Sequence, residues 1–175
     1  MIIRAAATDD AGALAAIYGH HVLHGLGTFE EIPPAAAEMA ARLAEVQAAG
    51  LPYLVAEDGG PILGFAYASL FRARSAYRFT VEDSVYVTPD AMGRGLGKAL
   101  LGAVIGDCEA MGMRQMIAVI GDSANVGSIG LHAALGFTHA GLGRSLGFKH
   151  GRWVDIVWMQ RALNAADDPQ PKPPA

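Results

Sequence analysis

The hydrophobic positions of the first 50 residues predict one strand followed by two helices. Residues 2–5 form a short apolar run, and Thr8-Asp9-Asp10 then offers a helix cap with acidic residues in the first turn, where they oppose the helix dipole. Apolar residues recur after it at spacings of three and four, which is the pattern of one buried helix face: Leu14, Ile17, Tyr18, His21 and Val22. Gly25 and Gly27 end this helix, and a second helix is predicted from Pro33-Pro34 to Gly50.

Beyond Gly50 the pattern changes to that of strands. Residues 53–56 and 62–71 are apolar runs separated by the turn Asp58-Gly59-Gly60. Residues 79–88 are rich in β-branched and aromatic side chains and predict a further strand, which Pro89-Asp90 ends.

The remainder of the chain mixes both patterns. A helix is predicted over residues 95–111, a strand over 116–120, a helix over 125–135, and strands near 137–141 and 153–160. A polar, proline-rich segment follows, so we expect a folded domain over residues 1–163 and a disordered tail over 164–175. The fold class predicted from this order is a single mixed α/β (α+β) domain.

Composition narrows the class of protein. The 175 residues are 52% hydrophobic and 17% charged, which is typical of a compact soluble domain. The net charge of -4 argues against a general nucleic-acid partner, because binding phosphates along a strand requires a basic face. A local basic pocket for one anion is still compatible with this balance.

The cysteine and histidine residues narrow it further. A single cysteine, Cys108, excludes an intramolecular disulfide and favours a reducing compartment. The start of the sequence lacks a signal-peptide pattern, and charges interrupt every apolar run before the roughly 18 residues of a membrane span. We therefore expect a cytoplasmic protein without a membrane partner. His20, His21 and His24 have no carboxylate or cysteine that completes a tetrahedral set, so no metal is expected.

The most informative segment is the glycine-rich turn after the strand predicted over residues 79–88. Gly93, Gly95 and Gly97 lead directly into a helix, where glycine lets a ligand approach the backbone closely. The first N–H groups of that helix, among them the N–H of Leu96, have no intrahelical partner and attract anions. Arg94 and Lys98 add positive charge, so we predict a diphosphate site.

Two familiar phosphate-binding motifs do not fit this turn. A P-loop requires a glycine five residues before its Gly-Lys pair and a Ser or Thr after it, but here these positions are Met92 and Ala99. The dinucleotide fingerprint requires a glycine three residues after Gly95, where this chain has Lys98. A tight strand-to-helix turn without any ligand is the remaining alternative.

With these residues the segment resembles motif A of the GNAT superfamily of acetyltransferases, Q/R-x-x-G-x-G/A. Gly95 and Gly97 match its glycines, whereas Met92 stands where the family usually has Gln or Arg. Residues 121–137 resemble the next motif, N-x-x-S-x-x-L-H-x-x-L-G-F, with Asn125, Ser128 and His132 at its polar positions.

Three further stretches resemble the phosphinothricin and methionine sulfoximine acetyltransferase family. They are Arg72-Ala73-Arg74-Ser75-Ala76-Tyr77, residues 80–87, and Gly147-Phe148-Lys149-His150-Gly151-Arg152-Trp153. The resemblance spans roughly residues 2–162 and implies a mixed, mostly antiparallel sheet of six or seven strands flanked by helices. It also implies acetyl-coenzyme A (acetyl-CoA) as co-substrate and a homodimer.

The resemblance implies a role for several residues near the reaction. Backbone N–H groups of Val85, Tyr86 and Val87 are expected to bind the pantetheine arm, and Asn125 and Ser128 to contact the coenzyme. Glu82 matches the general base of the family, the alternative being a solvent-facing strand residue. His132 stands where many relatives carry a tyrosine that protonates the thiolate; a packed or solvated histidine is the alternative. Strand alternation places Asp83 opposite Glu82, so we expect a structural carboxylate there.

The candidate acceptor residues carry a guanidinium or an aromatic ring. Arg74 matches an arginine that anchors the acceptor in the family, and Arg72 lies two residues before it. A guanidinium suits this role because it donates two parallel hydrogen bonds to a carboxylate or phosphinate. Phe29, Tyr77 and Thr80 are the other substrate candidates. Surface charge and ordinary loop packing are the alternatives.

Three functions follow from this set. The first is acetylation of the amino group of a small amino-acid analogue of the phosphinothricin or methionine sulfoximine/sulfone type. The second is acetylation of another amine, such as a protein N-terminus. The third is a non-catalytic coenzyme A-binding module.

Overall fold

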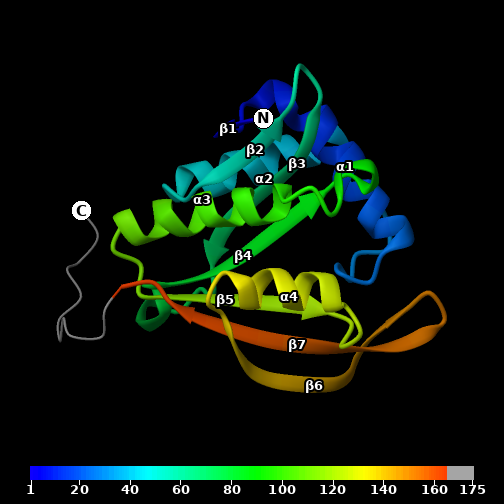
Figure 1. Ribbon diagram of the computed structural model, residues 1–175, viewed down its shortest axis with the longest axis vertical. Helices are drawn as coiled ribbons and strands as arrows, with labels where there is room; N and C mark the ends of the chain where they lie inside the picture. Colours follow the sequence, from blue (N-terminus) through cyan, green and yellow to red (C-terminus); the bar gives the residue numbers. More distant parts are fainter. Residues whose placement is uncertain (165–175) are drawn as a thin grey trace.

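A computed structural model describes residues 1–164 of the chain (Figure 1). The strands within them are β1 (Ile2–Ala5), β2 (Tyr53–Glu57), β3 (Ile62–Leu70), β4 (Thr80–Val87), β5 (Gln115–Gly121), β6 (Thr138–Lys149) and β7 (Arg152–Ala162). The α-helices are α1 (Ala11–His24), α2 (Ala36–Ala48), α3 (Leu96–Ala110) and α4 (Val126–Ala134). Short 3-10 helices are η1 (Thr8–Asp10), η2 (Ser75–Tyr77) and η3 (Pro89–Ala91).

The strands form one sheet of seven in the order β1-β2-β3-β4-β5-β7-β6. Every neighbouring pair is antiparallel except β4 and β5, which run parallel. The mixed, mostly antiparallel sheet flanked by helices that the sequence predicted is therefore confirmed.

The parallel pair separates soon after it forms. Pairing between β4 and β5 covers only three residue pairs and ends where Glu82 lies opposite Ile117. From there β4 continues along β3 to Val87 while β5 continues along β7 to Gly121. The sheet consequently opens like a V between β4 and β5. We call the point where the two strands separate, at Glu82, the apex of this V.

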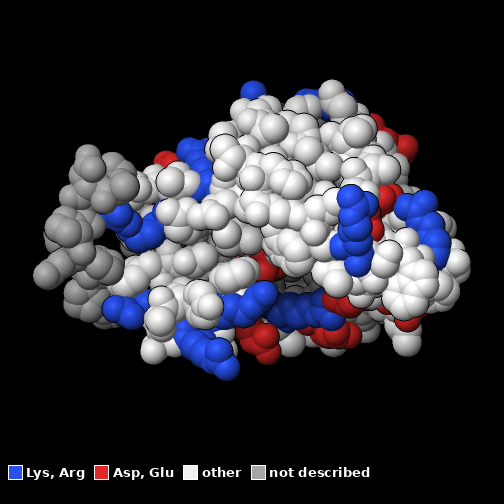
Figure 2. Space-filling model, turned by 90° about the horizontal axis from the view of Figure 1, so that it is seen from below, with Lys and Arg blue, Asp and Glu red and all other residues white. Residues whose placement is uncertain are grey.

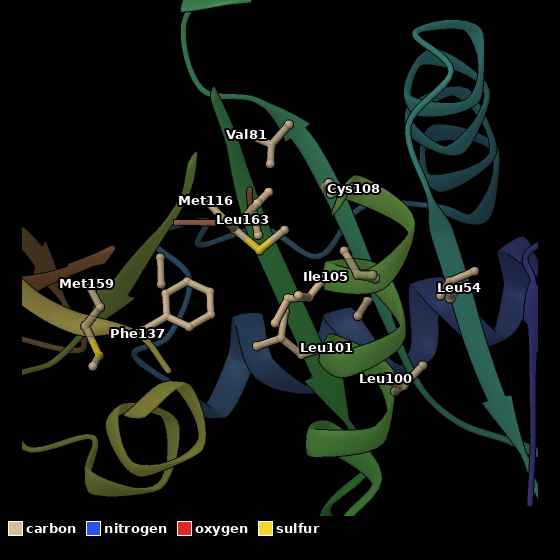
Figure 3. Close-up of a cluster of buried hydrophobic side chains, with 14 of the residues drawn as sticks. Leu54, Val81, Leu100, Leu101, Ile105, Cys108, Met116, Phe137, Met159 and Leu163 are labelled. Carbon is tan, nitrogen blue, oxygen red and sulfur yellow. The ribbon is translucent and has the colours of Figure 1, made fainter. Parts of the chain in front are cut away.

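Helices cover both faces of the sheet and bury two apolar clusters. The larger cluster joins the inner side of α3, with Leu100, Leu101 and Val104, to Val81 of β4 and Met116 of β5 (Figure 3). Cys108 belongs to it and is fully buried, as expected for a small core residue. The smaller cluster lies between α1, α2 and the opposite face of β2 and β3.

Two local predictions need refinement. The N-cap of α1 is Asp10, within the predicted Thr8-Asp9-Asp10, but its side chain makes no cap hydrogen bond; the chain turns through η1, and Asp10 accepts hydrogen bonds from Ala7 N at 2.7 Å and from Arg4 at 2.7 and 2.9 Å. The strand predicted over 137–141 extends to Lys149. Glycines and two register shifts hid its length, because they break the alternation on which strand prediction depends.

The boundary predicted between residues 163 and 164 falls at the last residues that the structure describes. Asn164, the first residue of the predicted tail, donates hydrogen bonds to Glu109 O at 3.1 Å and Met113 O at 2.8 Å. The rest of that prediction, residues 165–175, lies outside the described part of the chain. Among residues 1–164 there is no helix with the length and apolar character needed to cross a membrane.

Figure 2 shows how charge is distributed over one face of the molecule. Lys and Arg side chains lie beside Asp and Glu side chains on this face rather than forming a continuous basic surface. Mixed charge of this kind gives little attraction to a polyphosphate strand.

Candidate active site

A cavity of about 560 Å³ occupies the opening between β4 and β5. Its walls are β4, β5, the turn that leads into α3, the first turns of α4 and the segment after α1. Most of the predicted coenzyme residues line it: Val85, Tyr86, Val87, Gly93, Gly95, Leu96, Gly97, Lys98, Asn125 and Ser128. The structure therefore brings together two motifs that lie far apart in the sequence.

Backbone alternation decides which peptide groups of β4 face this cavity. Thr88 N donates to Leu63 O at 2.8 Å, so the even-numbered residues of this strand hydrogen-bond to β3. The peptide groups of Val85 and Val87 consequently face the cavity, where β5 has diverged. The N–H of Tyr86 points to β3 by the same alternation. The cavity edge of β4 is thus a row of backbone groups available to an extended ligand.

The glycine turn lies where β4 ends. Gly93 and Gly95 have φ values of 74° and 83°, which a side chain would strain, and Gly95 is the N-cap of α3. Ala99 N makes the first intrahelical bond, to Gly95 O, so the N–H groups of the three residues before Ala99 are free to bind a ligand. A 15-residue helix therefore directs its positive end at the cavity.

The two cations of the turn lie in different places. Lys98 lines the cavity. Arg94 does not: its guanidinium lies 3.4 Å from Asp58, with both side chains about half exposed. An exposed ion pair of this length contributes little to stability, so Arg94 remains free to exchange partners.

The second motif supplies the opposite wall. Asn125 caps α4, because its Oδ1 accepts a hydrogen bond from Ser128 N at 3.1 Å while its Nδ2 donates to Gly121 O at 3.4 Å. Leu131 of α4 lies 3.3 Å from the position that a Cβ on Gly97 would take. The absence of a side chain at Gly97 therefore keeps the cavity open between α3 and α4.

Glu82 lies at the apex of the V, on the face of the sheet opposite Asp83. Its side chain is half-buried, and this burial raises the pKa of the Glu82 carboxyl above its ordinary value. The positive charge of Arg72 opposes that shift, and the negative charge of Asp83 adds to it. A carboxylate whose pKa is raised is a stronger base than an ordinary exposed carboxylate, which is the property that a general base requires.

Asp83 and His132 form a buried pair on the other face. His132 Nε2 lies 2.9 Å from Asp83 Oδ2, and both side chains are nearly inaccessible to solvent. His132 Nδ1 lies 2.7 Å from Ser128 O. Both residues line the cavity. The sequence predicted Asp83 as structural and left open whether His132 was packed, but it did not predict their contact.

The candidate acceptor residues lie outside this cavity. Arg72, Arg74 and Tyr77 are exposed on the connection between β3 and β4, and Thr80 begins β4. Arg72 stacks over the Phe71 ring at 4.2 Å and is close enough to influence the pKa of Glu82. These residues therefore belong to the apex side of the sheet, away from the glycine turn.

Phe29 lies on the loop between α1 and α2, which the C-terminal hairpin holds in place. Its ring packs against Gly147 of β6, where an added Cβ would force the ring to move. Beside it, buried Lys149 donates from Nζ to Thr28 O at 2.7 Å. Thr28 Oγ1 also shares a hydrogen bond of 2.7 Å with the Tyr18 hydroxyl. The motif around Lys149, which the sequence gave no role, thus fixes the loop that carries Phe29.

His21 is a cavity residue that the sequence analysis did not select. Its Nε2 donates to Val87 O at 2.9 Å, and burial lowers its pKa below the ordinary value for histidine. The spacing of the first helix had placed His21 on the buried face, which was the available signal. This histidine connects α1 to the end of β4 beside the glycine turn.

Comparison with known proteins agrees with this geometry. The profile of the acetyltransferase (GNAT) family matches residues 21–137. A phosphinothricin N-acetyltransferase of Alcaligenes faecalis is 56% identical over 97% of this chain and 86% of its own length. A Salmonella typhimurium L-methionine sulfoximine/L-methionine sulfone acetyltransferase is 38% identical over 94% of this chain and 95% of its own.

A solved structure extends the similarity to the fold. The crystal structure of a GNAT superfamily phosphinothricin acetyltransferase from Sinorhizobium meliloti in complex with acetyl-CoA has a TM-score of 0.94 and 50% identity, covering 98% of this chain and 92% of that one. The family match, the relatives and the fold agree with one another. The chain therefore belongs to the GNAT family of acetyltransferases and is an N-acetyltransferase that uses acetyl-CoA.

Proposed function

We propose that this enzyme acetylates the α-amino group of a small amino-acid analogue of the phosphinothricin or methionine sulfoximine/sulfone type, with Glu82 as general base. The observation that carries the proposal is the opening between β4 and β5, which runs from the glycine turn to Asp83, the neighbour of Glu82 at the point where the two strands separate. The names of the relatives support the acceptor class.

The chain's own groups suit the binding of acetyl-CoA along this opening. The free N–H groups at the start of α3 and the ammonium of Lys98 bind the diphosphate, with Arg94 available from its exposed pair. The cavity-facing N–H groups of Val85 and Val87 and the carbonyl group of Val85 bind the pantetheine amides as an added strand would, while the carbonyl group of Val87 accepts from His21. This places the acetyl thioester at the apex, next to Glu82.

A general base is needed because the acceptor amine is mostly protonated at neutral pH, and we assign this role to Glu82. An amine with a pKa of about 10.4 costs roughly 4–5 kcal/mol to deprotonate at pH 7, and one with a pKa of about 7.7 costs about 1 kcal/mol. Only the neutral amine attacks the carbonyl carbon, so a positioned base raises the rate. Glu82 takes this proton directly or through one water, and a cavity-facing backbone N–H of β4 donates to the carbonyl oxygen as its charge grows.

Acetylation of another amine is the competing function, and a panel of acceptors separates the two. Release of coenzyme A thiol is measured with phosphinothricin, methionine sulfoximine and methionine sulfone, and in parallel with a peptide N-terminus and a polyamine. We expect turnover with the first three and much less with the others, because Arg72 and Arg74 favour an anionic acceptor. Preferred turnover of the peptide or the polyamine would contradict the proposed acceptor class.

Replacing Arg74 by alanine is expected to raise the KM of the acceptor at least tenfold while the affinity for acetyl-CoA is unchanged. The reason is the loss of a charge-assisted hydrogen bond, about 1.5–3 kcal/mol, at a residue that does not line the coenzyme cavity. Steady-state kinetics and calorimetry measure the two quantities. Arg78→Ala is the matched control, because Arg78 is exposed four residues away and stacks on Phe79 at 4.6 Å. A loss of acetyl-CoA affinity in Arg74→Ala would contradict the prediction, because it would show that Arg74 contacts the coenzyme rather than the acceptor.

A homodimer in the cytoplasm is part of the proposal. The rings of Phe148 and Trp153 at the β6–β7 turn are 58% and 64% exposed, and their centroids lie 5.3 Å apart. Aromatic side chains are enriched at protein–protein interfaces, so this pair is the surface that we propose a second copy covers. The cytoplasmic location rests on the unpaired thiol of Cys108. Light scattering should give twice the 18.2 kDa of one chain, and Trp153→Glu should reduce it. A monomer at every concentration would contradict the dimer.

A further inference from the structure

A second pocket lies between α2 and the face of the sheet that carries Glu82. It measures about 200 Å³ and shares no lining residue with the coenzyme cavity. Glu45 is exposed and Arg42 is partly exposed, so these two residues of α2 form its mouth. Tyr53 of β2 is only 3% exposed and lines its inner end. A pocket of this size suits a side chain of a few heavy atoms rather than a whole coenzyme.

The hydroxyl group of Tyr53 is the unusual feature of this pocket. It is buried and has no hydrogen-bond partner among residues 1–164. Burial raises the pKa of Tyr53 well above its ordinary value, so the hydroxyl keeps its proton and can donate a hydrogen bond. A buried polar group without a partner destabilises a folded protein. Phenylalanine would fill the same space without this cost, which indicates that the hydroxyl serves a ligand.

The ring that carries this hydroxyl is held in one orientation. It stacks on the Tyr67 ring with centroids 4.7 Å apart and on the Phe65 ring with centroids 5.7 Å apart. The planes of these rings differ by only 12° and 16°. The hydroxyl oxygen of Tyr53 therefore has a fixed position, which is the condition for selecting one ligand group over another.

The register of the sheet relates the pocket to the reaction. Tyr53 of β2 pairs with Tyr67 of β3, and Ser69, two residues further along β3, lines the pocket and pairs with Glu82 of β4. Residues paired across strands project from the same face of a sheet. Two strand spacings, about 10 Å, separate β2 from β4. An acceptor whose amino group lies at Glu82 can therefore extend its side chain over Ser69 toward Tyr53.

Polarity and charge decide which side chains fit. The aromatic rings of the wall suit an aliphatic stem. The Arg42 guanidinium at the mouth donates to Glu30 at 2.7 and 3.0 Å and also forms an ion pair with Glu38. Glu45 adds a further negative charge beside it. Because the mouth has no net positive charge, an uncharged tip is favoured over an anionic one, and the Tyr53 hydroxyl requires that this tip accept a hydrogen bond.

We propose that this pocket binds the side chain of the acceptor, and that the Tyr53 hydroxyl donates a hydrogen bond to an uncharged sulfone or sulfoximine oxygen at its tip. The inference rests on the proposed function, in which the amino group of the acceptor lies next to Glu82. Tyr53 is then a specificity-determining residue, because a site built around a hydrogen bond rejects an analogue that lacks the bonding group. Methionine is such an analogue of methionine sulfone, since a thioether sulfur is only a weak acceptor.

Tyr53→Phe removes the hydroxyl and keeps the ring. We expect kcat/KM for methionine sulfone to fall at least fivefold, while kcat/KM for methionine and the dissociation constant of coenzyme A stay within twofold of wild type. Tm should equal or exceed that of wild type, because an unpaired buried hydroxyl has been removed. An unchanged ratio of the two kcat/KM values, or a clearly lower Tm in Tyr53→Phe, overturns the inference.

Thr88→Val is the matched control. Thr88 Oγ1 is also buried without a hydrogen-bond partner in the described part of the chain, and Thr88 does not line this pocket. The variant removes an orphan hydroxyl of the same kind, so its Tm should also equal or exceed that of wild type. Its preference for methionine sulfone over methionine should be that of wild type. An equal loss of preference in Thr88→Val overturns the assignment to Tyr53.

A binding measurement separates this inference from the proposed function. Calorimetry follows methionine sulfone as it is added to protein saturated with coenzyme A, so no turnover is needed. We expect the dissociation constant to be at least fivefold higher in Tyr53→Phe than in wild type. Sulfone that binds in this way but is not acetylated contradicts the proposed function alone. Acetylation of sulfone with equal affinity in the two proteins, or no binding of sulfone to wild type, overturns the inference.

Discussion

Gly97→Leu is expected to weaken the binding of acetyl-CoA at least 100-fold, about 2.8 kcal/mol. A Cβ at this position would lie 3.3 Å from Leu131 Cδ2, 3.8 Å from Val87 Cγ2 and 3.9 Å from Val85 Cγ2, all of them side chains of the cavity wall. The remaining atoms of a leucine therefore extend into the space between β4 and α4. They would occupy the path of the pantetheine arm and cover the free N–H groups of α3.

Calorimetry with coenzyme A measures this effect, and a glycine of the same helix provides the control. Gly106 is exposed, and a Cβ there meets nothing within 4 Å, so Gly106→Leu should bind coenzyme A normally. Leucine is also the better helix former, by several tenths of a kcal/mol, so Tm should rise slightly in the control. Normal binding by a folded Gly97→Leu protein would show that the coenzyme does not pass between α3 and α4.

Local patterns of the sequence predicted most of the fold because they report which face of each element is buried. The spacing of apolar residues identified α1 and α2, and the breaks at Gly50 and Pro89 separated the strands. β6 was predicted too short for a related reason. A Cβ on Gly143 would lie 2.8 Å from the Trp158 ring, so glycine packs there without a clash. In the sequence, however, a glycine at this position indicates a turn rather than a strand.

The site was predictable where its chemistry lies in one segment. The glycine turn is a strand, three glycines and a helix start in succession, and its role in anion binding follows from that order. The divergence of β4 from β5 at Glu82 depends on pairing between residues 35 positions apart, which no local pattern reports.

Long-range contacts account for the residues that the sequence analysis missed. Lys149 and Thr28 are 121 residues apart, and Asp83 and His132 are 49 apart. A lysine in a strand gives no sign that its ammonium will be buried against a carbonyl oxygen, since most lysines remain exposed. Strand alternation correctly placed Asp83 and Glu82 on opposite faces, but only the packing of α4 on β4 reveals the partner of Asp83.

Glu82→Gln is expected to lower kcat at least about 100-fold, because a positioned general base contributes 10²–10⁴ in rate. The amide keeps the shape of the side chain, so the affinity for coenzyme A and Tm should stay close to wild type.

The pH profile identifies the base. The activity of the wild type should rise with pH through a pKa above 4.5, since burial favours the protonated form of Glu82. This rising limb of the profile should be absent from the residual activity of Glu82→Gln. Arg72→Ala sharpens the test, because Arg72 lowers the pKa of Glu82, and without it the limb should move to higher pH. Equal turnover of Glu82→Gln and wild type, or an unchanged limb in Arg72→Ala, would assign the deprotonation of the amine to another group.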